Sequence, residues 1–229
     1  MSKTRILAAA AVAIAAASGW WMLRAPAGPG QTAFVAPSPV TGANAQEAGA
    51  TTEAAQVPDM VLGLQDAPVT VIEYASFTCP HCANFHENVF GKLKADYIDS
   101  GKVRFVYREV YFDKFGLWAA MVARCGGAEK YFGIADMLYD NQRDWLAPGE
   151  DAGIADNLRK IGLKAGLASE TLDACLSDND MAKAMVATYQ ANAGADGINS
   201  TPSFIIDGQK YSNMAYADFA KVIEEKLAD

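Results

Sequence analysis

The chain has 229 residues, of which 51% are hydrophobic and 20% are charged, and this composition is typical of a globular protein. Its formal net charge is −8, and Lys and Arg form no basic run beyond the extreme N-terminus. We therefore expect no nucleic-acid partner, because nucleic-acid binding depends on clustered positive charge.

The N-terminal quarter of the chain does not have a globular pattern. In residues 1–24, Lys3 and Arg5 precede an apolar, Ala-rich run with two tryptophans near its outer end. This pattern predicts either a cleaved signal peptide or a retained membrane anchor, and both would export the rest of the chain. Residues 25–58 are rich in Ala, Pro, Gly, Thr and Gln, with no amphipathic period, which predicts a disordered linker.

Residues 59–229 begin with strand and helix patterns. A short edge strand is expected at residues 60–64, and the β-branched run 69–75 predicts a buried central strand. A helix over 80–98 follows, and alternating apolar and charged residues over 102–110 predict a second core strand. Because a helix joins the two core strands, we expect them to be parallel.

A helical segment at about residues 113–193 separates these strands from a hairpin. The expected helices are Lys114–Cys125, Glu129–Asn141, Glu150–Ile161, Ser169–Ser177 and Met181–Ala193. Beyond it, strand 203–206 runs into an Asp-Gly turn, which is a hairpin signal, and an amphipathic helix is expected over 216–227. The order of elements predicts an α/β fold.

The tetrapeptide Cys79-Pro80-His81-Cys82 lies where the first core strand gives way to a helix. The unpaired N–H groups and the dipole of a helix start favour an anion, and the thiolate is the reactive form of cysteine. Cys79 is therefore the predicted nucleophile of thiol–disulfide exchange, and Cys82, one turn deeper, is the predicted resolving thiol. Pro80 suits the helix start because no N–H donor is needed there.

The other two cysteines, Cys125 and Cys175, both fall in the helical segment. An even number of cysteines in an exported protein favours disulfides. A bridge between these two would close a loop of about fifty residues and contribute roughly 4 kcal/mol. We predict a structural disulfide; the alternative is a second redox pair, which nothing in the local sequence supports.

Two segments, 71–82 (VIEYASFTCPHC) and 197–208 (GINSTPSFIIDG), together with the intervening helical segment, carry a resemblance to a known family. The chain resembles the thioredoxin superfamily and, within it, the DsbA-like disulfide oxidoreductases of the bacterial cell envelope. The resemblance covers residues 59–229. It implies a thioredoxin fold with a helical domain inserted between the second core strand and a hairpin that begins with a cis-proline.

The resemblance implies roles for further residues. His81 is expected to tune the redox pair, the alternative being a solvated residue at the helix start. Glu73 is expected to exchange protons with the deeper cysteine, and otherwise to be a paired or partly hydrated carboxylate. His86 is expected to be an ordinary residue on the helix face.

Pro202 matches the cis-proline that faces the cysteines and binds extended substrate, although an ordinary trans proline in a turn is the alternative. Thr201 precedes it, where the best-known oxidases of the family have an aliphatic residue. This departure leaves disulfide isomerase or reductase activity open beside oxidase activity.

Other kinds of site fit less well. A haem site needs histidine directly after the second cysteine, but residue 83 is alanine. A zinc site at Cys79, Cys82 and a neighbouring histidine lacks a second ligand pair. A thioredoxin-like chaperone or binding module would not need both cysteines. No cofactor and no metal is expected beyond the redox-active disulfide.

The sequence thus predicts a thiol:disulfide interchange protein of the periplasm or cell envelope. Its expected partners are reduced exported polypeptides and, from the resemblance, a membrane protein linked to quinones that reoxidises it. The linker has no heptad pattern for oligomerisation, so a monomer is expected.

Overall fold

The computed structural model describes residues 57–228, so the predicted export segment and residues 25–56 of the predicted linker lie outside the described residues. The domain begins slightly earlier than predicted. Val57 is buried and its N–H donates to Thr188 Oγ1 over 3.0 Å, while the carbonyl of Pro58 accepts from Arg124. Among residues 57–228, no helix combines the length and hydrophobicity that a membrane crossing requires.

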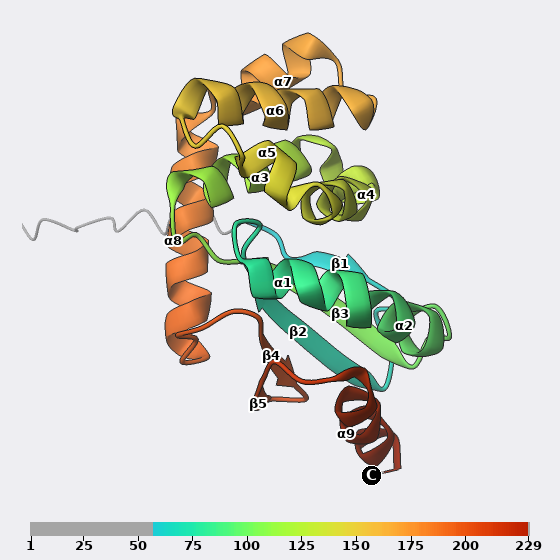
Figure 1. Cartoon of the computed structure of the whole chain (residues 1–229). Coiled ribbons are helices and arrows are strands. Elements are labelled where there is room, and N and C mark those ends of the chain that lie inside the picture. The colour runs from blue at the N-terminus through green and yellow to red at the C-terminus, as the bar shows by residue number, and fades with distance from the viewer. Residues whose placement is uncertain (1–56, 229) are drawn as a thin grey trace, which may run out of the picture. The chain divides into compact units, whose positions relative to one another are not determined.

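A five-stranded mixed sheet forms the centre of the described domain (Figure 1). Its spatial order is β1-β3-β2-β4-β5. The strands are β1 (Met60–Leu62), β2 (Val69–Ala75), β3 (Val103–Glu109), β4 (Ser203–Ile206) and β5 (Gln209–Ser212). The predicted parallel pairing of the two core strands, β2 and β3, is confirmed, and the other neighbours pair antiparallel. β2 is therefore a central strand, and its C-terminal end leads directly to the cysteine pair.

The helix predicted over residues 80–98 contains two π-helical segments. It consists of α1 (Pro80–Phe85), η1 (His86–Phe90), α2 (Gly91–Leu93) and η2 (Lys94–Ile98). A π turn holds more residues than an α turn, so side chains beyond those of an α-helical stripe face the sheet. Val89 and the adjacent Phe90 are both buried, and so is the His86 side chain next to the buried Phe85.

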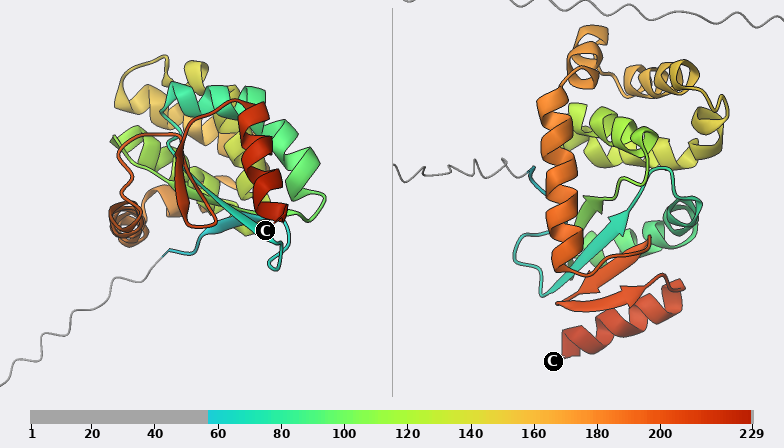
Figure 2. Two further views of the ribbon diagram at one scale, coloured as in Figure 1. Left: turned by 90° about the horizontal axis from the view of Figure 1, so that it is seen from below. Right: turned by 90° about the vertical axis from the view of Figure 1, so that its left-hand side faces the viewer.

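Most of the inserted helices stack beyond one end of the sheet, but the last of them runs alongside the sheet, and the C-terminal helix lies toward the other end (Figures 1 and 2). The inserted helices are α3 (Lys114–Cys125), α4 (Gly127–Asp140), α5 (Gln142–Leu146), α6 (Asp151–Lys164), α7 (Ser169–Leu176) and α8 (Asn179–Ala195), followed after the hairpin by α9 (Tyr216–Ala228). The predicted fold is confirmed, except that α5 was not predicted, since five residues are too short to show a helical period.

Both faces of the sheet are covered, since successive side chains of β2 point to opposite faces and those of Tyr74 and Ala75 are both fully buried. On one face, Phe85 of α1, Phe204 of β4 and Phe219 of α9 pack with ring centroids 4.8 to 6.0 Å apart. On the other face, Tyr74 and Ile205 pack with residues of α8. Helices thus pack against the sheet on both faces.

A buried polar network fastens the inserted helices to the sheet. Glu109, at the end of β3, accepts hydrogen bonds from Arg124 through both carboxylate oxygens, at 2.7 and 2.6 Å. The hydroxyl of Tyr131 donates to the same carboxylate over 2.8 Å. The Arg124 and Glu109 side chains are only 10% and 4% exposed, so loss of either partner would leave an uncompensated buried charge.

Candidate active site

Cys79 stands at the start of helix α1, and Pro80 is the first residue of that helix. The carbonyl of Cys79 accepts the backbone N–H of Cys82 over 3.1 Å and that of Ala83 over 3.2 Å. Both cysteines are free thiols in the structure; Cys79 is partly exposed, whereas Cys82 is completely buried. An incoming sulfur therefore reaches Cys79 and not Cys82.

The two thiols have opposite pKa shifts. The pKa of Cys79 is lowered to about 5, first by a hydrogen bond from Cys82, against the opposing effect of burial, and then by the Thr201 side chain. The backbone N–H groups of Cys82 and His81 add to this effect. Burial raises the pKa of Cys82 far above its usual range, and the hydrogen bond to Cys79 and the charge of Glu73 raise it further. At neutral pH the reduced pair is a Cys79 thiolate beside a Cys82 thiol.

His81 and Thr201 contact the Cys79 sulfur through different groups. The His81 side chain is exposed and makes no hydrogen bond within residues 57–228, so its contact with the sulfur is through its backbone N–H. Thr201 comes from the loop before β4, and its backbone oxygen lies 3.6 Å from Cys79 Sγ. The bond between Thr201 and the buried Pro202 is cis. Residues 122 positions apart in the sequence thus meet at the reactive sulfur.

Glu73 is fully buried on β2, and its partner is His86. Glu73 Oε2 lies 3.2 Å from His86 Nε2, and the His86 side chain is only 5% exposed. The expectation that His86 is an ordinary helix-face residue was wrong, because its side chain is buried and paired with a carboxylate of the central strand. His86 lies four residues after the buried Cys82, so the two side chains share the face of the helix that packs on the sheet.

Gln142 of α5 also belongs to the site, although the sequence offered no signal for it. Its side chain is 6% exposed, and Nε2 donates to the carbonyls of Phe77 over 2.8 Å and Cys79 over 2.9 Å. Both bonds join residues more than sixty positions apart, which no local pattern reveals. Through these two hydrogen bonds, Gln142 attaches the loop that contains Cys79 to the inserted helices.

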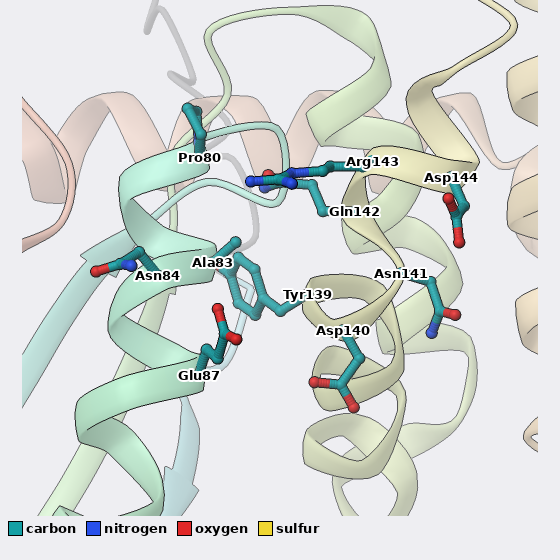
Figure 3. Close-up of a pocket in the computed structure, with 10 residues that line it drawn as sticks. All are labelled: Pro80, Ala83, Asn84, Glu87, Tyr139, Asp140, Asn141, Gln142, Arg143 and Asp144. Atoms are coloured by element: carbon teal, nitrogen blue, oxygen red, sulfur yellow. The ribbon is translucent and has the colours of Figure 1, made fainter.

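A polar cleft of about 420 Å³ lies beside the cysteine pair, between α1 and the junction of α4 with α5 (Figure 3). Pro80 and Glu87 line one side, and Asp140, Arg143 and Asp144 line the other. A second cleft, of about 510 Å³, lies on the other flank of the helix, between residues 84–92 and residues 213–216. The two clefts thus flank the helix that begins at Pro80.

Cys125 and Cys175 are joined by a disulfide that connects α3 to α7 within the inserted helices. Residues 57–228 contain no group of three or more His, Cys, Asp and Glu side chains arranged to hold a metal ion. The chemistry that this site can perform with its own groups is exchange between thiols and a disulfide.

A mixed five-stranded sheet, a Cys-x-x-Cys at the start of the helix that follows a central strand, and a cis-proline beside the first cysteine define a thioredoxin-fold protein. The family model described as Thioredoxin matches residues 55–225. The solved structure of alpha-DsbA1 from Wolbachia pipientis has a TM-score of 0.67 and 30% identity, covering 73% of this chain and 89% of that one. The chain therefore belongs to the thioredoxin family, in its DsbA-like branch.

Curated relatives agree with this family. A protein of Rickettsia bellii, provisionally named a protein-disulfide oxidoreductase, is 32% identical over 172 residues, which are 75% of this chain. Disulfide bond formation protein D of Bacillus subtilis is 29% identical over 180 residues, covering 73% of this chain and 76% of that protein. The chain spans 65% of the length of the rickettsial relative.

Proposed function

We propose that this protein is a thiol:disulfide oxidoreductase that donates the Cys79–Cys82 disulfide to reduced polypeptides after their export. One observation carries the proposal: a partly exposed Cys79 at a helix start stands beside a fully buried Cys82. In keeping with this geometry, the pKa of Cys79 is lowered to about 5 and that of Cys82 is raised. A thiolate of low pKa is a good leaving group and a stable product, so a disulfide that contains it is readily reduced. The pair therefore acts as an oxidant.

The reaction follows from which sulfur is exposed. A substrate thiolate attacks Cys79 Sγ, the Cys79–Cys82 bond breaks, and its electron pair passes to Cys82. A second substrate thiolate then attacks the substrate sulfur of the mixed disulfide and releases the Cys79 thiolate. The substrate gains a disulfide, and the protein is left with Cys79 and Cys82 reduced.

Residues around Cys79 are proposed to tune the reactivity of its sulfur and to bind substrate. Pro80 and His81 shape the helix start, where the backbone N–H of His81 favours the thiolate. Thr201 borders the sulfur, and with the cis-proline Pro202 it binds an extended substrate peptide. Glu73, buried behind Cys82, is proposed to exchange protons with that thiol.

The proposed location is the periplasm or cell envelope, on the basis of the export segment predicted in residues 1–24. Whether by a cleaved signal or a membrane tether, the domain faces reduced exported polypeptides there. By analogy with the family, a membrane protein linked to quinones reoxidises the pair, and the protein works as a monomer.

The test is the oxidative refolding of a reduced, disulfide-containing substrate protein by wild type and by Cys79→Ser. Wild type should accelerate disulfide formation, and the variant should lose all acceleration. Acceleration that persists in Cys79→Ser would show that the nucleophile is wrongly assigned.

Thr201 beside the sulfur favours a second candidate, disulfide isomerase activity. A substrate with scrambled disulfides separates the two: an isomerase restores its activity without added oxidant, and an oxidase does not.

A further inference from the structure

The polar cleft beside the cysteine pair has acidic walls. Glu87 of the first helix and Asp140 of α4 extend from its opposite walls, and Asp144 lies further along it (Figure 3). These three side chains are exposed, and none of them forms an ion pair with another of residues 57–228. Of the described residues that line the cleft, only Arg143 is basic. The cleft therefore has an excess of negative charge.

A buried hydrogen-bond acceptor lines the same cleft and is independent of these charges. Gln142 is 6% exposed, and its Nε2 donates to the backbone carbonyls of Phe77 and Cys79. Because a carbonyl only accepts, these two bonds fix which end of the amide group is nitrogen. Gln142 Oε1 is then left without a hydrogen-bond partner among residues 57–228. A polar atom of so buried a side chain is normally bonded, so the cleft offers an unused acceptor to a donor that enters it.

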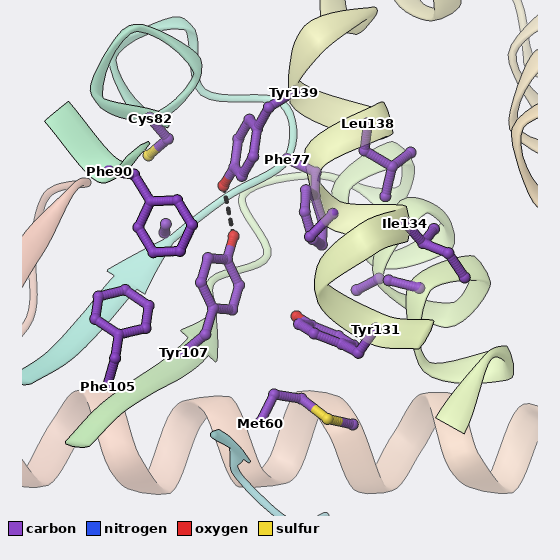
Figure 4. Close-up of a cluster of buried hydrophobic side chains, with 14 of the residues drawn as sticks. Met60, Phe77, Cys82, Phe90, Phe105, Tyr107, Tyr131, Ile134, Leu138 and Tyr139 are labelled. Atoms are coloured by element: carbon purple, nitrogen blue, oxygen red, sulfur yellow. Dashed lines mark hydrogen bonds between the residues drawn. The ribbon is translucent and has the colours of Figure 1, made fainter. Parts of the chain in front are cut away.

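The floor of the cleft is apolar. Ala83 and the ring of Tyr139 lie beside the Glu87 carboxylate (Figure 3). The Tyr139 hydroxyl is bonded to that of Tyr107 in the core (Figure 4), so its ring is what the side chain adds to the cleft. Acceptors around an apolar floor suit a side chain that has a methylene stem and a charged end.

The cleft begins next to the reactive sulfur. Pro80, the residue after Cys79, lines one end, and Glu87 lies about 10 Å further along the helix. In an extended peptide, a residue two positions from a cysteine lies about 7 Å from it, and its side chain reaches further. A substrate whose cysteine attacks Cys79 can therefore place a neighbouring side chain in this cleft.

We propose that this cleft is a subsite for a basic side chain of the substrate, one to three residues from the cysteine that attacks Cys79. This inference rests on the proposed function and names a preference among its substrates. Lysine and arginine side chains end in donors only, whereas the Glu87 and Asp140 carboxylates and Gln142 Oε1 accept. An acidic side chain at the same place meets like charges, so substrates with acidic neighbours of the cysteine react more slowly.

The experiment compares the rates at which three reduced peptides open the disulfide of oxidised full-length protein. The peptides are acetyl-Lys-Gly-Cys-Gly-Lys-amide and its two analogues with Gln or Glu at both lysine positions. Charges on both sides of the cysteine make the result independent of the direction in which the peptide binds. Each rate is divided by the concentration of peptide thiolate, because neighbouring charges change the pKa of the peptide cysteine.

The quantity that tests the proposal is the ratio of the rate with the Lys peptide to the rate with the Gln peptide. Taken within one protein, this ratio cancels any change in the reactivity of Cys79. In wild type at low ionic strength it should be about three to ten, and the Glu peptide should be the slowest. It should fall toward one in about 0.5 M NaCl, because salt screens exposed charges.

Single charge changes locate the preference. Glu87→Gln and Asp140→Asn should each lower the ratio about twofold, and the double variant should bring it near one. Arg143→Gln removes the opposing charge and should raise it. Glu129→Gln is the matched control, because it removes an exposed charge from the same helix as Asp140, about 16 Å along the axis and beyond the Debye length of about 8–10 Å. It should keep the wild-type ratio.

Equal corrected rates for the Lys and Gln peptides in wild type would overturn the proposal, whether or not any variant folds. A double variant that keeps the wild-type ratio would also overturn it. So would a ratio that falls as far in Glu129→Gln as in Glu87→Gln, since the preference would then come from the acidity of the whole domain. Failure of the proposed function looks different, because then none of the three peptides would open the disulfide.

Discussion

The low pKa of Cys79 depends on Cys82 more than on any other group, and this dependence can be tested by replacing Cys82 with alanine. Because the pKa of Cys82 is raised, it stays a thiol and donates a hydrogen bond to the Cys79 thiolate. A hydrogen bond to a charged group contributes about 1.5–3 kcal/mol, and one pKa unit corresponds to about 1.4 kcal/mol. Cys82→Ala should therefore raise the pKa of Cys79 by roughly one to two units.

The pKa should not return to the ordinary value of a thiol. The Thr201 side chain and the backbone N–H groups of His81 and residue 82 remain in the variant and still favour the thiolate. Starting from about 5, the midpoint of the Cys79 titration should therefore reach about 6 to 7 in Cys82→Ala.

The assay follows the ultraviolet absorbance of the thiolate against pH in reduced protein, with Cys79→Ala as the blank. Cys82→Ser is the matched control, because its hydroxyl keeps a donor at the same position. Its midpoint should lie below that of Cys82→Ala. A midpoint in Cys82→Ala equal to that of wild type, or equal midpoints in the two variants, would refute the hydrogen-bond explanation.

Three further predictions concern stability. Replacing both Cys125 and Cys175 with serine should lower the free energy of unfolding by about 2–4 kcal/mol in urea titrations, while the rate of exchange at Cys79 stays the same. Glu109→Gln should cost about 3–5 kcal/mol in the same assay, because Arg124 is left buried without a counter-charge; a loss below about 1 kcal/mol would contradict this. The folded pKa of Cys79 is depressed, so its stabilisation of the reduced protein is complete above the unfolded pKa and is lost as pH falls through about 5. Relative to Cys79→Ser, the free energy of unfolding of the reduced protein should rise by up to roughly 1 kcal/mol per pH unit between about pH 5 and about pH 9, after allowance for solvent screening. A difference between the two proteins that does not change with pH would contradict this.

Local patterns were enough to predict much of the fold. The β-branched run of β2 and the alternation of β3 each carry a two-residue period, and the helix between them requires parallel pairing, which the structure has. The position of Cys79 at a helix start follows from the same pattern. These features depend on residues close together in the sequence.

The rest of the site depends on features that no local pattern encodes. His86 was misjudged because its partner, Glu73, lies 13 residues earlier on a strand, and no local pattern marks that pairing. Gln142 was missed because its hydrogen bonds join α5 to a loop more than sixty residues earlier. A single glutamine in a short helix has no sequence feature that distinguishes it from a solvent-exposed residue.

The central claim is that the Cys79–Cys82 pair is an oxidant because its exposed thiolate is stabilised. The redox equilibrium of this pair with glutathione tests the claim most directly. The account predicts a potential well above that of cytosolic thioredoxin, which is about −270 mV, and toward the range of strong oxidants, about −120 mV. A potential as reducing as that of thioredoxin would contradict it.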